Sequence, residues 1–322
     1  MSSPVWPSEA GSAFPRGAET AILSPVTLSV VIITYNEEVN LARTLESVIP
    51  LVRDGKGEII VVDSGSTDRT VEIARSFGAK VFVEEWKGYA AQKNSAIDKA
   101  SGDWILSLDA DEEVDESLSS EIAVLGQPAG PDQAARLEHL QRIRYVFTRQ
   151  TWREFRQVAT QRGVSDESLF VAISGFWIPR KNFFLGRWIK HGGFWPDPKL
   201  RLFRKGAAHF EDRLVHEDAK LVDGVSGKLK HALLHHSYPT LSDYLDHMNR
   251  YSSLGAETVA AKGPVRFSVI NIAVRPLLTF IYNYFFRLGF LDGREGLLLH
   301  LYHAVYVSWK YAKAWELGRR KP

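Results

Sequence analysis

The chain contains three short apolar runs rich in β-branched residues, and each ends in polar or acidic side chains. They are SVVIIT at residues 29–34, EIIVVD at 58–63 and WILSLD at 104–109. Runs of this length and composition are typical of strands buried on both faces of a sheet. Helical stretches at residues 71–77 and 90–100 follow the second run and precede the last. This alternation predicts an α/β domain with a mostly parallel sheet and helices on both faces.

Asp109 and Asp111 stand directly at the end of the third run. Ligands of open α/β sheets bind beyond the carboxyl ends of the strands. Two carboxylates one residue apart can both face a single divalent ion, which would bridge the oxygens of a diphosphate. Carboxylate ligands favour hard ions, so the pair indicates Mg²⁺ or Mn²⁺. A solvated turn explains an isolated pair of this kind equally well, and the neighbouring motifs therefore decide between the two.

Further motifs accompany the acidic pair, in order, along residues 28–115. The first run ends in TYNE (residues 34–37), the second continues as VVDSGSTD (61–68), and Lys93 and Asn94 precede the third. The ordered set resembles the family 2 glycosyltransferases. These are inverting enzymes of the GT-A fold, a Rossmann-like α/β architecture, and they take sugar from a nucleotide diphosphate donor. An unrelated α/β domain is the alternative, which the ordered set disfavours.

The resemblance implies roles for particular side chains. Those implied at the donor nucleotide are Thr34, Tyr35, Asn36, Glu37, Asp63, Asp68, Lys93 and Asp109. Among them, Asp63 matches the acidic residue that usually meets the uracil or ribose. The resemblance also implies a metal site formed by Asp109, Asp111 and Glu113.

Motifs in the second half resemble the lipopolysaccharide-core β-glucosyltransferase branch of this family. They lie at residues 178–186, 191–197, 200–204, 214–217 and 290–296. The resemblance implies transfer of a hexose, glucose from UDP-glucose, with inversion to a β-linkage on a glycolipid such as the lipopolysaccharide inner core. Transfer to a polyprenyl phosphate is the alternative within the same class of enzyme.

A catalytic base is expected in the motif VHED at residues 215–218. Inverting transfer is a single displacement, so a carboxylate must lie within hydrogen-bond reach of the acceptor hydroxyl. Glu217 resembles the family's base in position, and Asp218 is its competitor. A surface salt bridge is the alternative role for Glu217.

Arg201 lies on an expected strand at residues 199–204. Arg201 or its neighbour Arg204 can bind a phosphate of the donor through two parallel hydrogen bonds. A half-exposed strand with solvated charges is an equally good interpretation.

The 322 residues and 45% apolar composition are enough for a packed core, and the absence of cysteine excludes disulfides and zinc–thiolate sites. We expect residues 1–26 to form a flexible tail without a secretory signal. A GT-A domain is expected at residues 27–235 and a helical region at 236–322. An insertion at about 126–172 departs from the family pattern. It is either a solvated excursion or a lid beside the acceptor.

The C-terminal region is basic and rich in aromatic residues. From Lys262 onward there are ten Lys or Arg against three Asp or Glu, a balance of +7. The apolar stretches at residues 276–286 and 297–309 are too short to cross a bilayer, since about 20 residues are needed. They predict a pair of amphipathic helices in an anionic membrane interface, peripheral to the cytoplasmic face of the inner membrane. Packing on the catalytic domain or on another subunit is the alternative, and nucleic acid is disfavoured because the region is too apolar.

Two other classes of function remain open. A sugar-phosphate nucleotidyltransferase also holds a metal-bound nucleotide on an α/β sheet, but it needs a glycine-rich basic loop where this chain has TYNEE at residues 34–38. A non-enzymatic membrane scaffold would not need the acidic pair, the nucleotide-side acid and the expected base together.

Overall fold

The computed structural model describes residues 27–125, 173–211, 218–222, 224–263 and 265–320, together with residues 153, 157 and 160. The expected tail at residues 1–26, nearly all of the expected insertion, and Glu217 lie outside the described residues.

A seven-stranded sheet forms the centre of the fold, in the order β12-β6-β9-β4-β1-β2-β3. Its strands are β1 (Leu28–Thr34), β2 (Gly57–Asp63), β3 (Lys80–Val83), β4 (Trp104–Asp109), β6 (Ile173–Ile178), β9 (Lys199–Arg204) and β12 (Val225–Lys228). Strands β1 to β4 are mutually parallel, β6 is parallel to β12, and β9 runs antiparallel to both β4 and β6. The expectation of a mostly parallel α/β sheet is confirmed.

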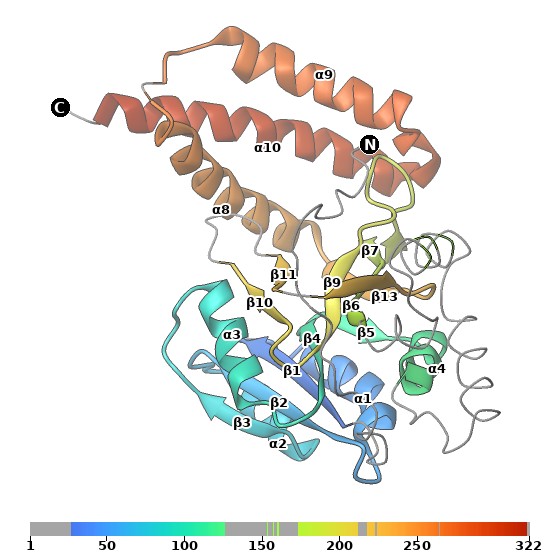
Figure 1. The fold of residues 1–322 in the computed structure, drawn as a ribbon. Coiled ribbons are helices and arrows are strands. Elements are labelled where there is room, and N and C mark those ends of the chain that lie inside the picture. The colour runs from blue at the N-terminus through green and yellow to red at the C-terminus, as the bar shows by residue number, and fades with distance from the viewer. Residues whose placement is uncertain are drawn as a thin grey trace.

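Helices cover both faces of this sheet (Figure 1). They are α1 (Leu41–Val52), α2 (Thr70–Ser76), α3 (Tyr89–Lys99) and α4 (Glu116–Leu125). Successive side chains of a strand point to opposite faces. In β1, Val30 joins the core cluster that contains Leu45 of α1, whereas Val31 joins the one that contains Ile97 of α3. Both faces of the central strands are therefore buried, which explains why their sequences are continuous apolar runs.

A second, four-stranded sheet has the order β5-β13-β7-β8. Its strands are β5 (Glu112–Val114), β7 (Arg180–Phe184), β8 (Arg187–Trp188) and β13 (Leu233–Tyr238). Strand β13 runs antiparallel to β5 and parallel to β7, so it brings side chains that are far apart in sequence to the end of β4. A separate antiparallel pair consists of β10 (Ala208–Phe210) and β11 (Ala219–Leu221).

The C-terminal region is helical, as expected. It comprises α8 (Leu241–Ala260), η1 (Ile270–Val274), α9 (Arg275–Ile281), η2 (Tyr282–Phe286), η3 (Gly289–Asp292) and α10 (Gly293–Arg320). The α10 helix packs along α8, and α9 lies on α10, on the side away from the sheet (Figure 1). In the part of the chain that the structure describes, no helix is long and apolar enough to cross a membrane.

Candidate active site

The ends of β1, β2 and β4 lie side by side at one edge of the central sheet. Thr34 is in register with Asp63, and Ile33 is in register with Asp109. Because these strands are parallel, their carboxyl ends meet, and the side chains expected at the nucleotide gather there.

Asp63 organises the loop that follows β2. Its buried carboxylate accepts hydrogen bonds from the Thr34 hydroxyl (2.8 Å), from the Ser66 hydroxyl (2.5 Å), and from the backbone N–H groups of Gly65 (2.9 Å) and Ser66 (2.8 Å). The carboxylate thereby fixes the loop against the end of β1.

Asn36 joins the loop after β1 to the loop after β2. Its side-chain oxygen accepts from the Thr67 N–H at 2.9 Å, and its own N–H donates to the Ser66 hydroxyl at 2.8 Å. The φ of Asn36 is +54°, a left-handed conformation that asparagine tolerates better than most residues. Tyr35 is exposed beside it. These two loops form a rigid, polar rim at the carboxyl edge.

Asp68 extends the same rim. Its carboxylate accepts from the Glu38 N–H at 3.1 Å and from the Thr70 hydroxyl at 2.5 Å, while that hydroxyl accepts from the Glu37 N–H at 2.7 Å. Asp68 and the backbone of Glu37 therefore help to hold the two loops together.

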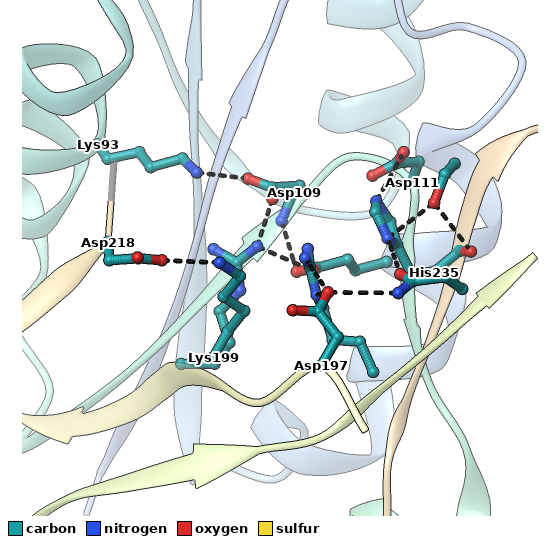
Figure 2. A network of polar contacts seen from close by, with 12 residues as sticks. Lys93, Asp109, Asp111, Asp197, Lys199, Asp218 and His235 are labelled. Carbon is teal, nitrogen blue, oxygen red and sulfur yellow. Dashed lines mark hydrogen bonds and ion pairs between the residues drawn. The ribbon is translucent and has the colours of Figure 1, made fainter. Parts of the chain in front are cut away.

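Asp109 is flanked by two cations (Figure 2). Lys93 Nζ lies 2.7 Å from its Oδ1, and Arg201 Nη2 contacts its Oδ2. Burial alone would raise the pKa of Asp109, but the charges of Arg201 and Lys93 outweigh it and hold that pKa well below the ordinary value. Asp109 is ionised, and two of the predicted donor-site residues, Lys93 and Arg201, converge on it.

Glu112 is the centre of the charge network and was not among the expected site residues. It is fully buried; Oε1 accepts from Arg201 Nη2 at 2.7 Å and from Arg180 Nη1 at 2.9 Å, and Oε2 accepts from the Asp109 N–H at 3.0 Å. Both carboxylate oxygens are thus engaged, as burial of a charge requires. Alternation along β5 gives Glu112 and Glu113 opposite faces. That period-2 alternation is the sequence signal that would have distinguished the buried Glu112 from Glu113.

Arg180 and Asp197 continue the network and were also missed. The Arg180 guanidinium donates to Asp197 Oδ2 from Nη2 at 2.5 Å and from Nε at 3.1 Å. Burial disfavours the charged form of Asp197, but the Arg180 charge overcomes this and lowers the pKa of the carboxyl. Asn182 Nδ2 donates to the same oxygen at 3.3 Å.

Asp111 faces His235 across a short gap (Figure 2). His235 Nε2 lies 3.4 Å from Asp111 Oδ2, and His235 Nδ1 lies 2.6 Å from Asn182 Oδ1. Burial alone would raise the pKa of Asp111, but the contact with His235 outweighs it and lowers that pKa. The His236 N–H donates to the Asp111 carbonyl at 3.0 Å, which holds this loop against β13.

Asp111 and His235 fit a divalent ion in chemistry and in charge. A carboxylate oxygen and an imidazole nitrogen are both established metal ligands in proteins. Burial, aided by the negative charges of Asp111 and Asp109, raises the pKa of the nearby Glu37. This side of the site therefore carries surplus negative charge that a cation would relieve.

The structure does not gather Asp109, Asp111 and Glu113 around one point. Glu113 lies on the other face of β5, where its Oε2 is 2.9 Å from His236 Nε2 and 3.8 Å from Arg43 Nε. Within the described ranges, no group of three or more histidine or acidic side chains could hold a metal ion. The three-carboxylate metal site remains a prediction, and His235 is the closer companion of Asp111.

Of the two expected bases, Glu217 lies outside the described residues and Asp218 is placed. Asp218 Oδ1 lies 2.8 Å from Lys199 Nζ at the start of β9, two residues before Arg201 (Figure 2). Arg204 instead donates to the Ile173 carbonyl at 2.9 Å and stacks over Trp104, so it lies away from the cluster.

The comparison with protein families decides the identity. The profile of glycosyl transferase family 2 matches residues 29–205, more than half of the chain. The chain belongs to glycosyl transferase family 2. This glycosyltransferase is 28% identical to an uncharacterized glycosyltransferase of Rickettsia typhi over 300 residues, 90% of this chain and 87% of the relative. It is 26% identical to the lipopolysaccharide core biosynthesis glycosyltransferase LpsC of Rhizobium meliloti over 306 residues, 92% and 94% of the two chains.

One of the solved structures that are similar to this chain is glucosyl-3-phosphoglycerate synthase from Mycobacterium tuberculosis, in complex with Mn²⁺, uridine diphosphate and glucosyl-3-phosphoglycerate. The identity is 33%, the TM-score is 0.25, and the match covers 27% of this glycosyltransferase and 34% of that chain.

Proposed function

We propose that this glycosyltransferase transfers a hexose, glucose from UDP-glucose, with inversion to a β-linkage on a lipid-linked acceptor such as the lipopolysaccharide inner core. The observation that carries the proposal is the arrangement of two aspartates after β4. Asp109 contacts the cations Lys93 and Arg201, and Asp111 faces His235. The carboxyl ends of the strands thus bring together two cations at Asp109 and, at Asp111 and His235, two possible ligands for a metal ion. A nucleoside diphosphate needs both kinds of partner.

The relatives support the acceptor class. LpsC is named for lipopolysaccharide core biosynthesis and is similar to this glycosyltransferase along nearly its whole length. Acceptors of this kind carry an apolar anchor, which agrees with the exposed apolar side chains of α9 and η2.

The residues at the edge would share the work of binding. Lys93 and Arg201 would hold the donor's anionic part in place of their present contacts with Asp109. Glu112 and Arg180 would keep Arg201 in position, since the buried Glu112 carboxylate bonds both guanidinium groups. Asp111 and His235 would hold Mg²⁺ or Mn²⁺. When bound, this ion neutralises charge that develops on the leaving diphosphate.

The transfer step requires one proton acceptor. The acceptor hydroxyl oxygen forms a bond to the anomeric carbon while the bond from that carbon to the β-phosphate oxygen breaks, and the hydroxyl proton passes to a carboxylate. We assign that carboxylate to Glu217. Asp218 is the second candidate, although its ion pair with Lys199 already engages one of its oxygens.

We place the enzyme peripherally at the cytoplasmic face of the inner membrane. The chain has no cysteine, and the region from Lys262 onward combines a +7 balance with exposed apolar side chains. A basic, amphipathic helical region of this kind suits an anionic membrane surface. Two subunits packed through this region are the competing arrangement.

A panel of nucleotide sugars tests the proposed reaction. Purified protein is incubated with each donor and a core glycolipid, with and without Mn²⁺, and released nucleoside diphosphate is measured. We expect release from UDP-glucose that needs both the acceptor and the ion. Formation of pyrophosphate from UTP and a sugar phosphate would contradict transfer, and so would inertness toward every donor.

The same assay tests the base. Glu217→Gln should bind UDP-glucose and lose transfer, because the amide keeps the shape of the side chain and cannot accept the proton. An active Glu217→Gln with an inactive Asp218→Asn would assign the base to Asp218.

A further inference from the structure

A hollow of about 380 Å³ lies outside the active site, between η3 and β8 with the loop that follows it. Its lining residues are Arg187, Trp188, Lys190, His191, Leu291 and Asp292. The volume falls in the range of small-ligand pockets.

Asp292 is the acid among the described residues that line this hollow, and its carboxylate is engaged by the loop after β8. Asp292 is buried and accepts from the backbone N–H groups of Lys190 (3.1 Å) and His191 (2.8 Å), and the His191 ring Nδ1 lies 2.9 Å from it. Asp292 therefore fixes the loop after β8 and leaves the cations of the hollow without a strong counter-charge.

Lys190 is the most available of these cations. Its ammonium lies 4.4 Å from the centre of the Trp188 ring, and no carboxylate among the described residues pairs with it. Arg187 has only a long contact, 3.5 Å, with Glu295. A compact anion with several oxygens, such as a phosphate, matches two cations that line one hollow, one of them over an aromatic ring.

An exposed apolar segment adjoins the hollow. Twelve large apolar side chains between residues 267 and 291 are exposed, among them Leu278, Tyr282 and Phe286, and Leu291 belongs both to this segment and to the hollow. In Figure 1, α9 rests on α10 and turns its other side away from the molecule. Exposed apolar area of this extent is characteristic of a docking surface.

The charge of this segment favours one binding partner over another. Residues 262–291 contain four Lys or Arg and no Asp or Glu. A two-fold contact between identical copies would set these cations against one another, because such a contact uses the same patch twice. An anionic bilayer supplies both an apolar phase and negative headgroups.

We infer that α9, η2 and η3 lie in the surface of an anionic bilayer and that the Lys190–Arg187 hollow binds the phosphate of a lipid headgroup there. The loop that forms the hollow continues to Asp197, whose carboxylate holds Arg180 beneath the active site. Docking through this hollow would therefore fix the orientation of the catalytic edge to the membrane. The inference deepens the proposed function, on which it rests for the lipid acceptor.

Vesicle co-sedimentation of the full chain tests the inference. Neutral phosphatidylcholine vesicles are compared with vesicles that also contain phosphatidylglycerol, at low and at high salt. Lys190→Gln should lower binding to the anionic vesicles about fivefold, equivalent to about 1 kcal/mol for a cation near an anionic surface. The loss should persist at high salt, because a direct phosphate contact is screened less than an exposed charge.

Arg266→Gln is the matched control, since Arg266 is an exposed cation of the same apolar segment outside the hollow. Its effect should vanish at high salt, and Phe286→Ser should weaken binding to both kinds of vesicle. Equal behaviour of Lys190→Gln and Arg266→Gln at both salt concentrations would overturn the phosphate site.

Two further arms separate the competing occupants. Inorganic phosphate added at constant ionic strength should leave the protein on anionic vesicles, whereas release to the level of Lys190→Gln would assign the hollow to free phosphate. The apolar face would be assigned to a second copy if the protein does not bind vesicles and instead forms a concentration-dependent dimer that Phe286→Ser disrupts. None of these measurements needs sugar transfer, so an inactive protein that binds vesicles leaves the inference intact.

Discussion

At the scale of single residues, the site is organised around the buried carboxylate of Glu112. It bonds two guanidinium groups, Arg180 and Arg201, and the backbone of Asp109. Removing Glu112 leaves Arg180 with Asp197 alone and Arg201 with Asp109 alone in a largely buried site, which costs far more than losing a surface pair. Asp109 therefore depends on Glu112 for its position, because Glu112 accepts from its backbone N–H and the two carboxylates share Arg201 Nη2.

Glu112→Gln should lower the free energy of unfolding by about 3 kcal/mol, because two largely buried guanidinium groups lose their shared negative partner. Glu113→Gln is the natural control, since the adjacent side chain is partly exposed and should cost less than about 1 kcal/mol. Urea unfolding of the two variants and the wild type measures the difference. Equal stability of the two variants would show that the network does not hold the site together.

The neighbouring histidines of β13 offer a similar contrast. His235 faces Asp111, whereas His236 pairs with Glu113 and stacks on Phe183. His235→Ala should raise the Mn²⁺ concentration needed for half-maximal transfer about tenfold or more, because the ion loses a nitrogen ligand. His236→Ala should change it less than about twofold. An unchanged Mn²⁺ requirement in His235→Ala would remove His235 from the ion site.

At the scale of secondary-structure elements, the site depends on how the two sheets meet. Asp109 could be predicted from the sequence, because an apolar run and the turn after it form a local pattern, whereas Lys93 of α3 was predicted from the family resemblance. Glu112, Arg180 and His235 could not, because they come together only through the register of β5, β13 and β7, which pairs His235 with Glu112 and Asn182. Register between strands that lie many residues apart in the sequence has no local signature.

Glu121 of α4 ties this second sheet to the first. Its carboxylate accepts from the backbone N–H groups of Lys230 (2.8 Å) and His231 (2.9 Å), just before β13. Burial raises the pKa of Glu121 to about 7, and the two backbone hydrogen bonds only partly oppose the effect of burial.

This shift predicts a pH-dependent difference between the wild type and Glu121→Gln. A carboxyl whose pKa rises on folding contributes stability that is complete below its unfolded pKa of 4.5 and is lost as pH rises through about 7. The stability of the wild type relative to Glu121→Gln should thus fall by on the order of 3 kcal/mol between pH 4.5 and pH 8. Urea unfolding at both pH values measures it. A constant difference would mean that the backbone donors keep Glu121 ionised.

At the scale of the whole molecule, the helical region and the catalytic part share a core. Phe184 of β7 and Ile189 pack with Tyr244 of α8 and Leu299 of α10 in one cluster. The helices therefore do more than offer an apolar surface, because they buttress the same β7 strand that carries Arg180. The helical character of this region could be predicted from its composition, whereas its packing on β7 could not, since the contacts join residues that are far apart in the sequence.

The central claim is that the carboxyl edge binds a nucleoside diphosphate together with a divalent ion through Asp111. Calorimetric titration of UDP, with and without Mn²⁺, tests it in the wild type, in Asp111→Asn and in Asp98→Asn, which removes an exposed carboxylate of α3 away from the site. We predict that Mn²⁺ strengthens UDP binding about tenfold or more, a gain of about 1.4 kcal/mol, in the wild type and in Asp98→Asn. Asp111→Asn should abolish that gain. UDP binding that ignores Mn²⁺ in the wild type, or a full gain retained by Asp111→Asn, would contradict the claim.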